Sequence, residues 1–109
     1  MHKYHAKKTT VDGITFDSKK EALRYEELKI LERAGMIQDL RMQVAFELVP
    51  SFKYCGQTVR AVKYVADFVY IDGGRTIVED VKGYKTDVYA IKKKLLLYKY
   101  AEWIDFREV

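Results

Sequence analysis

The tripeptide Asp72-Gly73-Gly74 lies between two runs rich in β-branched and aromatic residues. Glycine adopts the positive φ angles that tight turns between antiparallel strands require, so the tripeptide strongly predicts a β-hairpin. A loop of the two glycines pairs the residues that flank it and, counting outward, sets Asp67 opposite Asp80. Directly opposed residues have Cβ atoms about 4.5–5.5 Å apart. Two carboxylates at that separation repel each other unless a cation lies between them.

The alternation of side chains along a strand sorts the acids of this hairpin by face. Asp67 is predicted to share a face with Val65 and Asp80, whereas Glu79 lies on the opposite face with Phe68. Both faces are rich in apolar residues, which predicts a central strand pair that is covered on both sides. Acidic side chains are rare in such surroundings unless they are paired or bound to a metal.

Two close carboxylates offer the hard oxygen ligands that Mg²⁺ or Mn²⁺ takes in proteins. Such an ion lowers the pKa of a bound water and offsets negative charge on a phosphodiester. Lys82, two residues after Asp80, is expected at the same edge, where it can orient a water or stabilise developing charge. The structural alternative is a buried network in which Asp67 and Asp80 pair with Lys82 or Arg60.

Turn and capping signals predict one mixed α/β domain over residues 1–109, a length that can bury a core without disulfides. Ser18 followed by Glu21 is typical of a capping box at a helix start. The predicted elements are a hairpin at 9–17 turning at Asp12-Gly13, a helix from Ser18 to Ala34, strands at 41–49, 58–71 and 75–82, a helix from Thr86 or Asp87, and a strand at 103–108. In the second helix Val88, Ile91, Leu95 and Tyr98 follow helical spacing, as in one face of an amphipathic helix.

The net charge of +4 is by itself a weak indication of nucleic-acid binding, but its distribution is informative. The first eight residues contain three lysines and no acid, and residues 82–99 contain six lysines against Asp87 alone. Both stretches can contact DNA phosphates or simply face solvent. The lysines predicted to contact the DNA backbone are Lys3, Lys7, Lys8, Lys19, Lys20, Lys85, Lys92, Lys93, Lys94 and Lys99.

Several functional classes are not expected from this sequence. It contains no apolar run long enough to span a membrane and no apolar stretch typical of a signal peptide at its start. The single cysteine, Cys55, cannot form an internal disulfide, so a reducing cytoplasmic setting is expected. Cys55 also lacks an evident activating base, and His2 and His5 lack neighbouring ligands for a metal site.

Three segments resemble the signature of the PD-(D/E)XK nuclease superfamily: residues 65–68 (VADF), 79–83 (EDVKG) and, at a helix start, 16–21 (FDSKKE). Ala66 stands where the signature has proline and Asp80 where it often has glutamate, and both are permitted variants. Nearly the whole chain also resembles the uncharacterised family DUF1064, which is common in phage and prophage genomes. The arrangement is similar to phage endonuclease I, a Holliday junction resolvase, and to a transposon end-cleaving nuclease subunit.

The resemblance implies a restriction-endonuclease-like core of order α-β-β-β-α-β, in which helices flank a mixed central sheet, with an N-terminal hairpin added. It implies a Mg²⁺-dependent endonuclease, with Mn²⁺ as a substitute, that acts on branched DNA in a phage or prophage setting. The implied site consists of Asp67, Asp80 and the Val81 carbonyl as metal ligands, Lys82 as the catalytic lysine, and Glu21 as the acid carried by the helix.

Alternatives remain open at this point. A four-way junction needs two cuts, so a resolvase is expected to be a symmetric homodimer. The chain could instead nick or cleave ordinary duplex DNA, or bind DNA without cutting it. Glu21 has an alternative role as a helix cap only. Gln43, Glu47 and Lys63 are expected near the core and have no assigned role.

Overall fold

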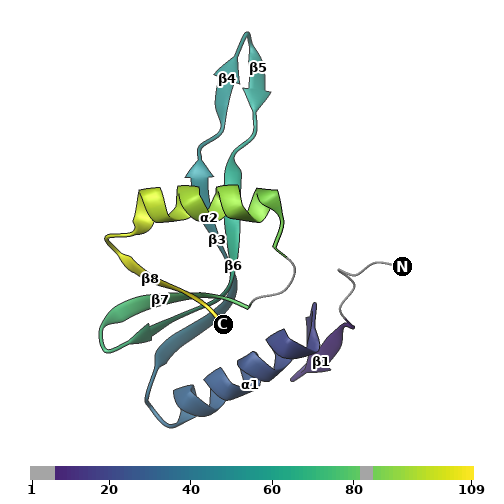
Figure 1. The fold of residues 1–109 in the computed structure, drawn as a ribbon, viewed down its shortest axis with the longest axis vertical. Coiled ribbons are helices and arrows are strands. Elements are labelled where there is room, and N and C mark those ends of the chain that lie inside the picture. Colours follow the sequence, from purple (N-terminus) through teal and green to yellow (C-terminus); the bar gives the residue numbers. More distant parts are fainter. Residues whose placement is uncertain (1–6, 82–84) are drawn as a thin grey trace.

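The computed structural model describes residues 7–81 and 85–109, which form one sheet with a helix on each face and two small hairpins (Figure 1). The helices are α1 (Lys19–Arg33) and α2 (Asp87–Tyr100). The strands are β1 (Thr9–Val11), β2 (Ile14–Phe16), β3 (Gln38–Val49), β4 (Phe52–Tyr54), β5 (Gln57–Val59), β6 (Val62–Asp72), β7 (Arg75–Asp80) and β8 (Ile104–Glu108). None of the helices in these residues is long and apolar enough to cross a membrane.

Both helices begin at the capping residues that the sequence indicates. The Ser18 hydroxyl accepts a hydrogen bond from the Glu21 backbone N–H at 3.1 Å, which satisfies one of the free amides at the start of α1. Thr86 caps α2 in the same way, accepting from the Tyr89 N–H at 3.0 Å. Gly35 follows α1 with φ of 75°, a conformation that glycine adopts without strain.

The central sheet has the strand order β3-β6-β7-β8 and is mixed. Strand β6 is antiparallel to both β3 and β7, whereas β8 is parallel to β7. Parallel neighbours need a long crossover, which α2 provides between β7 and β8. The predicted mixed α/β architecture with an N-terminal hairpin is therefore confirmed. The prediction of one strand at 58–71 is wrong, because this segment is divided into β5 and β6, and β5 pairs with β4 in a separate hairpin.

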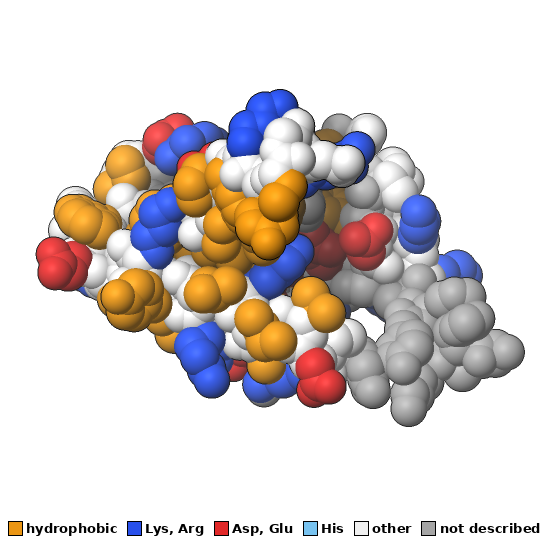
Figure 2. Space-filling model, turned by 90° about the horizontal axis from the view of Figure 1, so that it is seen from above, with side chains coloured by type: hydrophobic (Ala, Val, Ile, Leu, Met, Phe, Trp, Pro, Cys, Tyr) orange, Lys and Arg blue, Asp and Glu red, His pale blue; other side chains and the backbone are white. Residues whose placement is uncertain are grey.

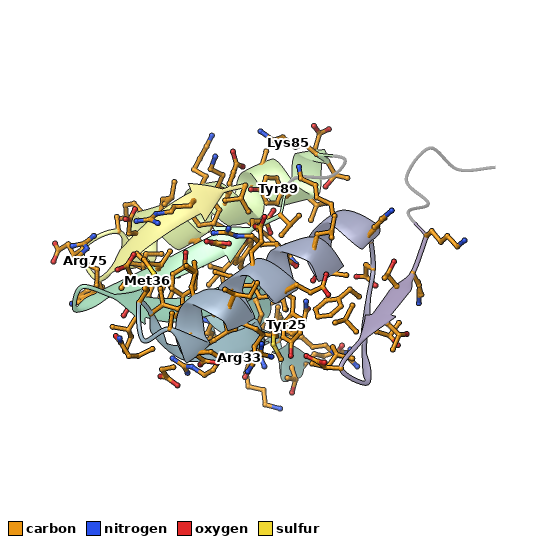
Figure 3. The ribbon with its side chains drawn as sticks, turned by 90° about the horizontal axis from the view of Figure 1, so that it is seen from below. Tyr25, Arg33, Met36, Arg75, Lys85 and Tyr89 are labelled. Atoms are coloured by element: carbon orange, nitrogen blue, oxygen red, sulfur yellow. The ribbon has the colours of Figure 1, made fainter. Side chains whose placement is uncertain are left out.

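A hydrophobic cluster lies on each face of the sheet. Phe68 and Ile77 pack with α1 on one face, and Val69 and Val78 pack with Leu96 of α2 on the other. Figure 3, seen from below, shows α1 across the nearer face and α2 beyond the sheet. The β6–β7 hairpin is thus covered on both sides, as its sequence predicts.

The register of the β6–β7 hairpin agrees with the prediction. Asp72 pairs with Arg75 and Phe68 with Glu79, so one further step sets Asp67 opposite Asp80. Val65, which was predicted to share a covered face with Asp67, is 49% exposed, whereas its neighbours Tyr64 and Ala66 are buried.

The cause lies in the neighbouring strand. Met42 pairs with Phe68 and Val44 with Ala66, which leaves Gln43 opposite Asp67 with a left-handed φ of 53°. A left-handed residue interrupts the regular alternation of a strand. Consequently Tyr64 and Ala66 pack in the same cluster as Val69, although strict alternation would put them on the opposite face.

Of the predicted apolar stripe of α2, Leu95 packs against the sheet, whereas Val88, Ile91 and Tyr98 do not. Val88 and Ile91 are each 60% exposed and Tyr98 is 92% exposed, whereas Leu96 is fully buried. The helix instead packs through Leu96 together with Tyr89, Leu95 and Tyr100. In the view from above, hydrophobic side chains remain visible on the surface of the molecule (Figure 2).

Candidate active site

Three acidic residues from three elements come together where α1 meets the β6–β7 hairpin. Asp67 lies in β6, Asp80 ends β7, and Glu21 lies in the first turn of α1. Glu21 is only 5% exposed although its charge favours water. Asp67 interacts with both Glu21 and Asp80 and so links the three predicted acids.

The Asp67 carboxylate is held by its backbone surroundings. The Val81 N–H donates a hydrogen bond to Asp67 Oδ2 at 2.8 Å. Burial raises the pKa of Asp67 to about 6, the Val81 N–H opposes this rise, and the negative charge of Asp80 adds to it. Hydrogen bonds with Glu21 and Gln43 lower the pKa of Asp67.

The Glu21 carboxylate belongs to the same cluster. Gln43 Nε2 donates to Glu21 Oε2 at 3.1 Å, which gives Gln43 a place in the site. Burial raises the pKa of Glu21 to about 7, and the charges of Asp67 and Asp17 raise it further. Capping by Ser18 uses the backbone N–H of Glu21, so capping alone does not explain where this side chain lies.

The Asp80 carboxylate contacts tyrosines that sequence reasoning missed. The Tyr64 hydroxyl donates to Asp80 Oδ1 at 2.8 Å, and Tyr89 also hydrogen-bonds with this carboxylate. Burial raises the pKa of Asp80, the Tyr64 hydrogen bond lowers it, and the charge of Glu108 raises it. Strict alternation of side chains could not predict the position of Tyr64, because the irregularity at Gln43 changes the face on which Tyr64 lies.

Beside Asp80, the start of α2 and the end of β8 form a second polar cluster. The Tyr89 hydroxyl donates to Glu108, and Lys93 Nζ lies 3.2 Å from Glu108 Oε2. The hydrogen bond from Tyr89 and, to a smaller extent, the contact with Lys93 lower the pKa of Glu108 to about 2. A groove of about 300 Å³ opens here, and Figure 3 shows Tyr89 and Lys85 at this end of α2. Its lining residues are Lys85, Tyr89, Ala90, Lys93, Lys94, Leu97 and Glu108.

Glu79 lies outside the acidic cluster, as the strand alternation predicted. It is fully buried on the α1 side, where Arg24 Nε and an Arg24 terminal nitrogen donate to its two carboxylate oxygens at 2.8 and 2.6 Å. The Tyr70 hydroxyl also donates to Glu79. These contacts satisfy the buried charge without a metal.

The predicted lysines differ in their surroundings. Lys82, Lys3, His2 and His5 lie outside the described residues, so the predictions for them stay predictions. Two of the other predicted lysines, Lys92 and Lys93, are half-buried, and the exposed ones are Lys7, Lys8, Lys19, Lys20, Lys85, Lys94 and Lys99. Lys85 pairs with Glu108 at 3.5 Å, and Lys99 Nζ donates to the Glu47 carbonyl at 3.0 Å. Arg60 is exposed, which argues against its pairing with Asp67 in a buried network.

The chemistry of the acidic cluster suits a hard divalent cation. Its carboxylates are partly removed from water, the charge of Asp67 raises the pKa of Glu21, and the charge of Asp80 raises the pKa of Asp67, which is the environment that a bound cation relieves. Within residues 7–81 and 85–109, however, no three His, Cys, Asp or Glu side chains are grouped tightly enough to hold a metal ion as they stand. The donor set therefore fits Mg²⁺ or Mn²⁺ in kind, and binding an ion would require the side chains to move together.

The fold and site define a mixed α/β protein with a cluster of buried and half-buried carboxylates at the meeting point of α1, β6 and β7. The chain belongs to the family described as "Protein of unknown function (DUF1064)", whose sequence model matches residues 1–107. No curated protein matches it.

Proposed function

We propose that the protein is a metal-dependent endonuclease that hydrolyses DNA phosphodiester bonds on a restriction-endonuclease-like core. The observation that carries the proposal is the clustering of acids around Asp67. Burial and the charge of Asp67 raise the pKa of Glu21 to about 7, and burial and the charge of Asp80 raise the pKa of Asp67 to about 6. Buried like charges are costly, and a site that keeps them is more readily explained by a cationic ligand than by stability.

The groups that would hold Mg²⁺ or Mn²⁺ are Asp67, Asp80, Glu21 and the Val81 carbonyl. When bound, such an ion supplies an activated water and offsets negative charge on the phosphodiester. Lys82 is proposed to stabilise the same developing charge, because it follows Asp80 by two residues.

Other residues position these groups. The Val81 N–H fixes one oxygen of Asp67, and the Gln43 amide fixes one oxygen of Glu21. The Tyr64 hydroxyl restrains Asp80. Hydrogen bonds of this kind orient the ligands of metal sites and tune their basicity.

Lysines beside the acidic cluster are proposed to bind the DNA backbone. The groove lined by Lys85, Lys93 and Lys94 lies next to Tyr89, which itself contacts Asp80. Phosphate contacts of this type position DNA without reading its sequence. We therefore favour recognition of DNA shape, and branched DNA such as a four-way junction as the substrate, with a symmetric homodimer supplying the two cuts.

The test compares cleavage of a labelled four-way junction with cleavage of a linear duplex that has matching arms. Each substrate is incubated with Mg²⁺, with Mn²⁺ or with EDTA. Paired, symmetric, metal-dependent cuts confined to the junction are the expected result. Equal cutting of both substrates would support a nuclease but contradict a preference for branched DNA. DNA binding by folded protein without cutting under any metal would leave a non-enzymatic DNA-binding protein.

A further inference from the structure

The hairpin of β4 and β5, with its flanking residues, projects from the end of the molecule (Figure 1). We define residues 50–61 as the arm. All residues from 50 to 60 are exposed, and β4 and β5 form a two-stranded sheet of their own. Neither hydrophobic cluster of the described residues includes an arm side chain. An isolated two-stranded hairpin is at best marginally stable in water, so the arm adds little to the folded core.

The side chains of the arm are unusual for a segment that only links two strands. Phe52 is 49% exposed and Tyr54 is 70% exposed, and the two lie on the same face because they are two residues apart. Val59 pairs with Phe52 across the hairpin and is 38% exposed, which extends this apolar face. Exposed aromatic groups gathered in this way are typical of binding surfaces.

The charge of the arm is positive. It contains Lys53 and Arg60, and no acid occurs between Glu47 and Asp67. Figure 2, which looks down on the molecule from the arm end, shows hydrophobic and basic side chains next to one another. Aromatic faces interleaved with cations are the combination that stacks on bases and neutralises phosphates. Two arms packed against each other would instead bring like charges together.

We propose that the arm is a DNA-contacting element that places Phe52 and Tyr54 against bases exposed at a branch or kink. This inference rests on the proposed action on DNA. Gln57 is ten residues from Asp67 in the sequence, so the arm reaches up to about 33 Å from the acidic cluster. That reach is close to one turn of duplex, about 34 Å. Lys53 and Arg60 contact phosphates beside the branch, and the aromatic rings insert as wedges.

The first test replaces the two aromatic residues with serine, Phe52→Ser with Tyr54→Ser. The matched control is Ile30→Ser with Met36→Ser, since these residues are 62% and 63% exposed near the end of α1, away from the arm. Binding of the labelled junction and of the linear duplex is measured by fluorescence anisotropy in EDTA. The arm variant is expected to bind the junction about tenfold or more weakly, with a smaller loss on duplex, while the control binds as wild type does.

A second variant removes the arm without opening the sheet. Val49 and Val62 are paired across β3 and β6, so an Asn-Gly turn can join them in place of residues 50–61. Losing two phosphate contacts should reduce the slope of log affinity against log salt by about 2. Junction binding of both arm variants equal to that of wild type would overturn the proposal. So would failure of the wild type to bind DNA.

Sedimentation of the free proteins tests a second copy of the chain as the occupant. A dimeric wild type that becomes monomeric without the arm would assign the arm to self-association and overturn the DNA proposal. Cleavage is scored separately with Mg²⁺. If the wild type binds DNA through the arm but never cuts it, the nuclease proposal is refuted and the arm proposal is supported. If the wild type cuts DNA and the arm variants bind and cut it equally well, the nuclease proposal is supported and the arm proposal is refuted.

Discussion

Arg24 and Glu79 form a two-pronged ion pair that joins α1 to β7, with contacts of 2.8 and 2.6 Å. Arg24 lies three residues after Glu21, and Glu79 lies one residue before Asp80. The pair therefore fixes the distance between the helix and the strand that carry two of the proposed metal ligands. A planar guanidinium held by both carboxylate oxygens restrains orientation as well as separation.

Breaking this pair should destabilise the fold. Arg24→Met leaves the fully buried Glu79 without its cation, so the free energy of unfolding is expected to fall by about 3–5 kcal/mol. Adding Glu79→Gln removes the uncompensated charge and keeps an acceptor for Tyr70, so the double variant should recover much of that loss. Urea denaturation measures both effects.

The control for the ion pair is Arg107→Met, because Arg107 pairs with Asp105 at 3.0 Å on the surface, with both side chains about two-fifths exposed. Exposed pairs contribute at most about 1 kcal/mol. Equal losses of unfolding free energy in Arg24→Met and Arg107→Met would show that the Arg24–Glu79 pair stabilises the fold no more than an exposed pair does.

Neutralising the acids of the cluster should separate cutting from binding. Asp67→Asn and Asp80→Asn are each expected to lower metal-dependent cleavage by more than about a hundredfold, since losing even a group that only orients a ligand costs about 10–100-fold. Binding to DNA in EDTA should stay equal or tighten, because a negative charge near phosphates is removed. Asp72→Asn, in the exposed turn of the same hairpin, is the control and should cut normally. Cleavage by Asp80→Asn at the wild-type rate would exclude Asp80 as a metal ligand.

Local sequence signals were sufficient for much of this fold. The glycine turn after Asp72 defined the β6–β7 register, and Ser18 defined the start of α1. The register also separated Asp80 from Glu79, which the structure pairs with Arg24 instead. These predictions succeeded because turn and capping chemistry depends on neighbouring residues alone.

Features that depend on contacts between distant strands could not be predicted. The left-handed backbone at Gln43 lies in β3, and nothing in its local sequence indicates it, yet it decides which face Tyr64 occupies. The α2 stripe was misleading for a related reason. Helical spacing identifies an apolar face, but packing on the sheet selected the face of Leu96 rather than that of Ile91.

The raised pKa values of the cluster predict a pH dependence of stability. The pKa of Glu21 rises from 4.5 to about 7, so the folded protein holds this proton more tightly than the unfolded chain does. Between these pH values the folded state binds more protons, and the free energy of unfolding therefore falls as the pH rises. Asp67, with a pKa raised to about 6, acts in the same direction. Thermal melting of metal-free protein from pH 4.5 to 7.5 measures the decline.

Two comparisons assign this decline to the cluster. Glu21→Gln removes the proton linkage of that side chain, so its melting temperature should vary less with pH over the same range. Saturating Mg²⁺ should stabilise the wild type more at pH 7.5 than at pH 5, because protons compete with the metal for the carboxylates. Identical pH profiles for wild type and Glu21→Gln would contradict the assignment.

Gln43 offers a way to separate stability from activity. Its φ of 53° is strained for a residue with a side chain, and its amide donates to Glu21. Gln43→Gly relieves the backbone strain at the cost of chain entropy, so the free energy of unfolding should change by less than about 1 kcal/mol. The same variant loses the amide that orients Glu21, and its affinity for Mg²⁺ or its cleavage rate should fall about 10–100-fold. Asp39→Gly is the matched control, since Asp39 has a φ of 56° in the same strand and an exposed side chain. Because the two variants make the same backbone change, a loss of metal affinity confined to Gln43→Gly would assign the effect to the Gln43–Glu21 hydrogen bond, and equal losses in both would assign it to the conformation of β3.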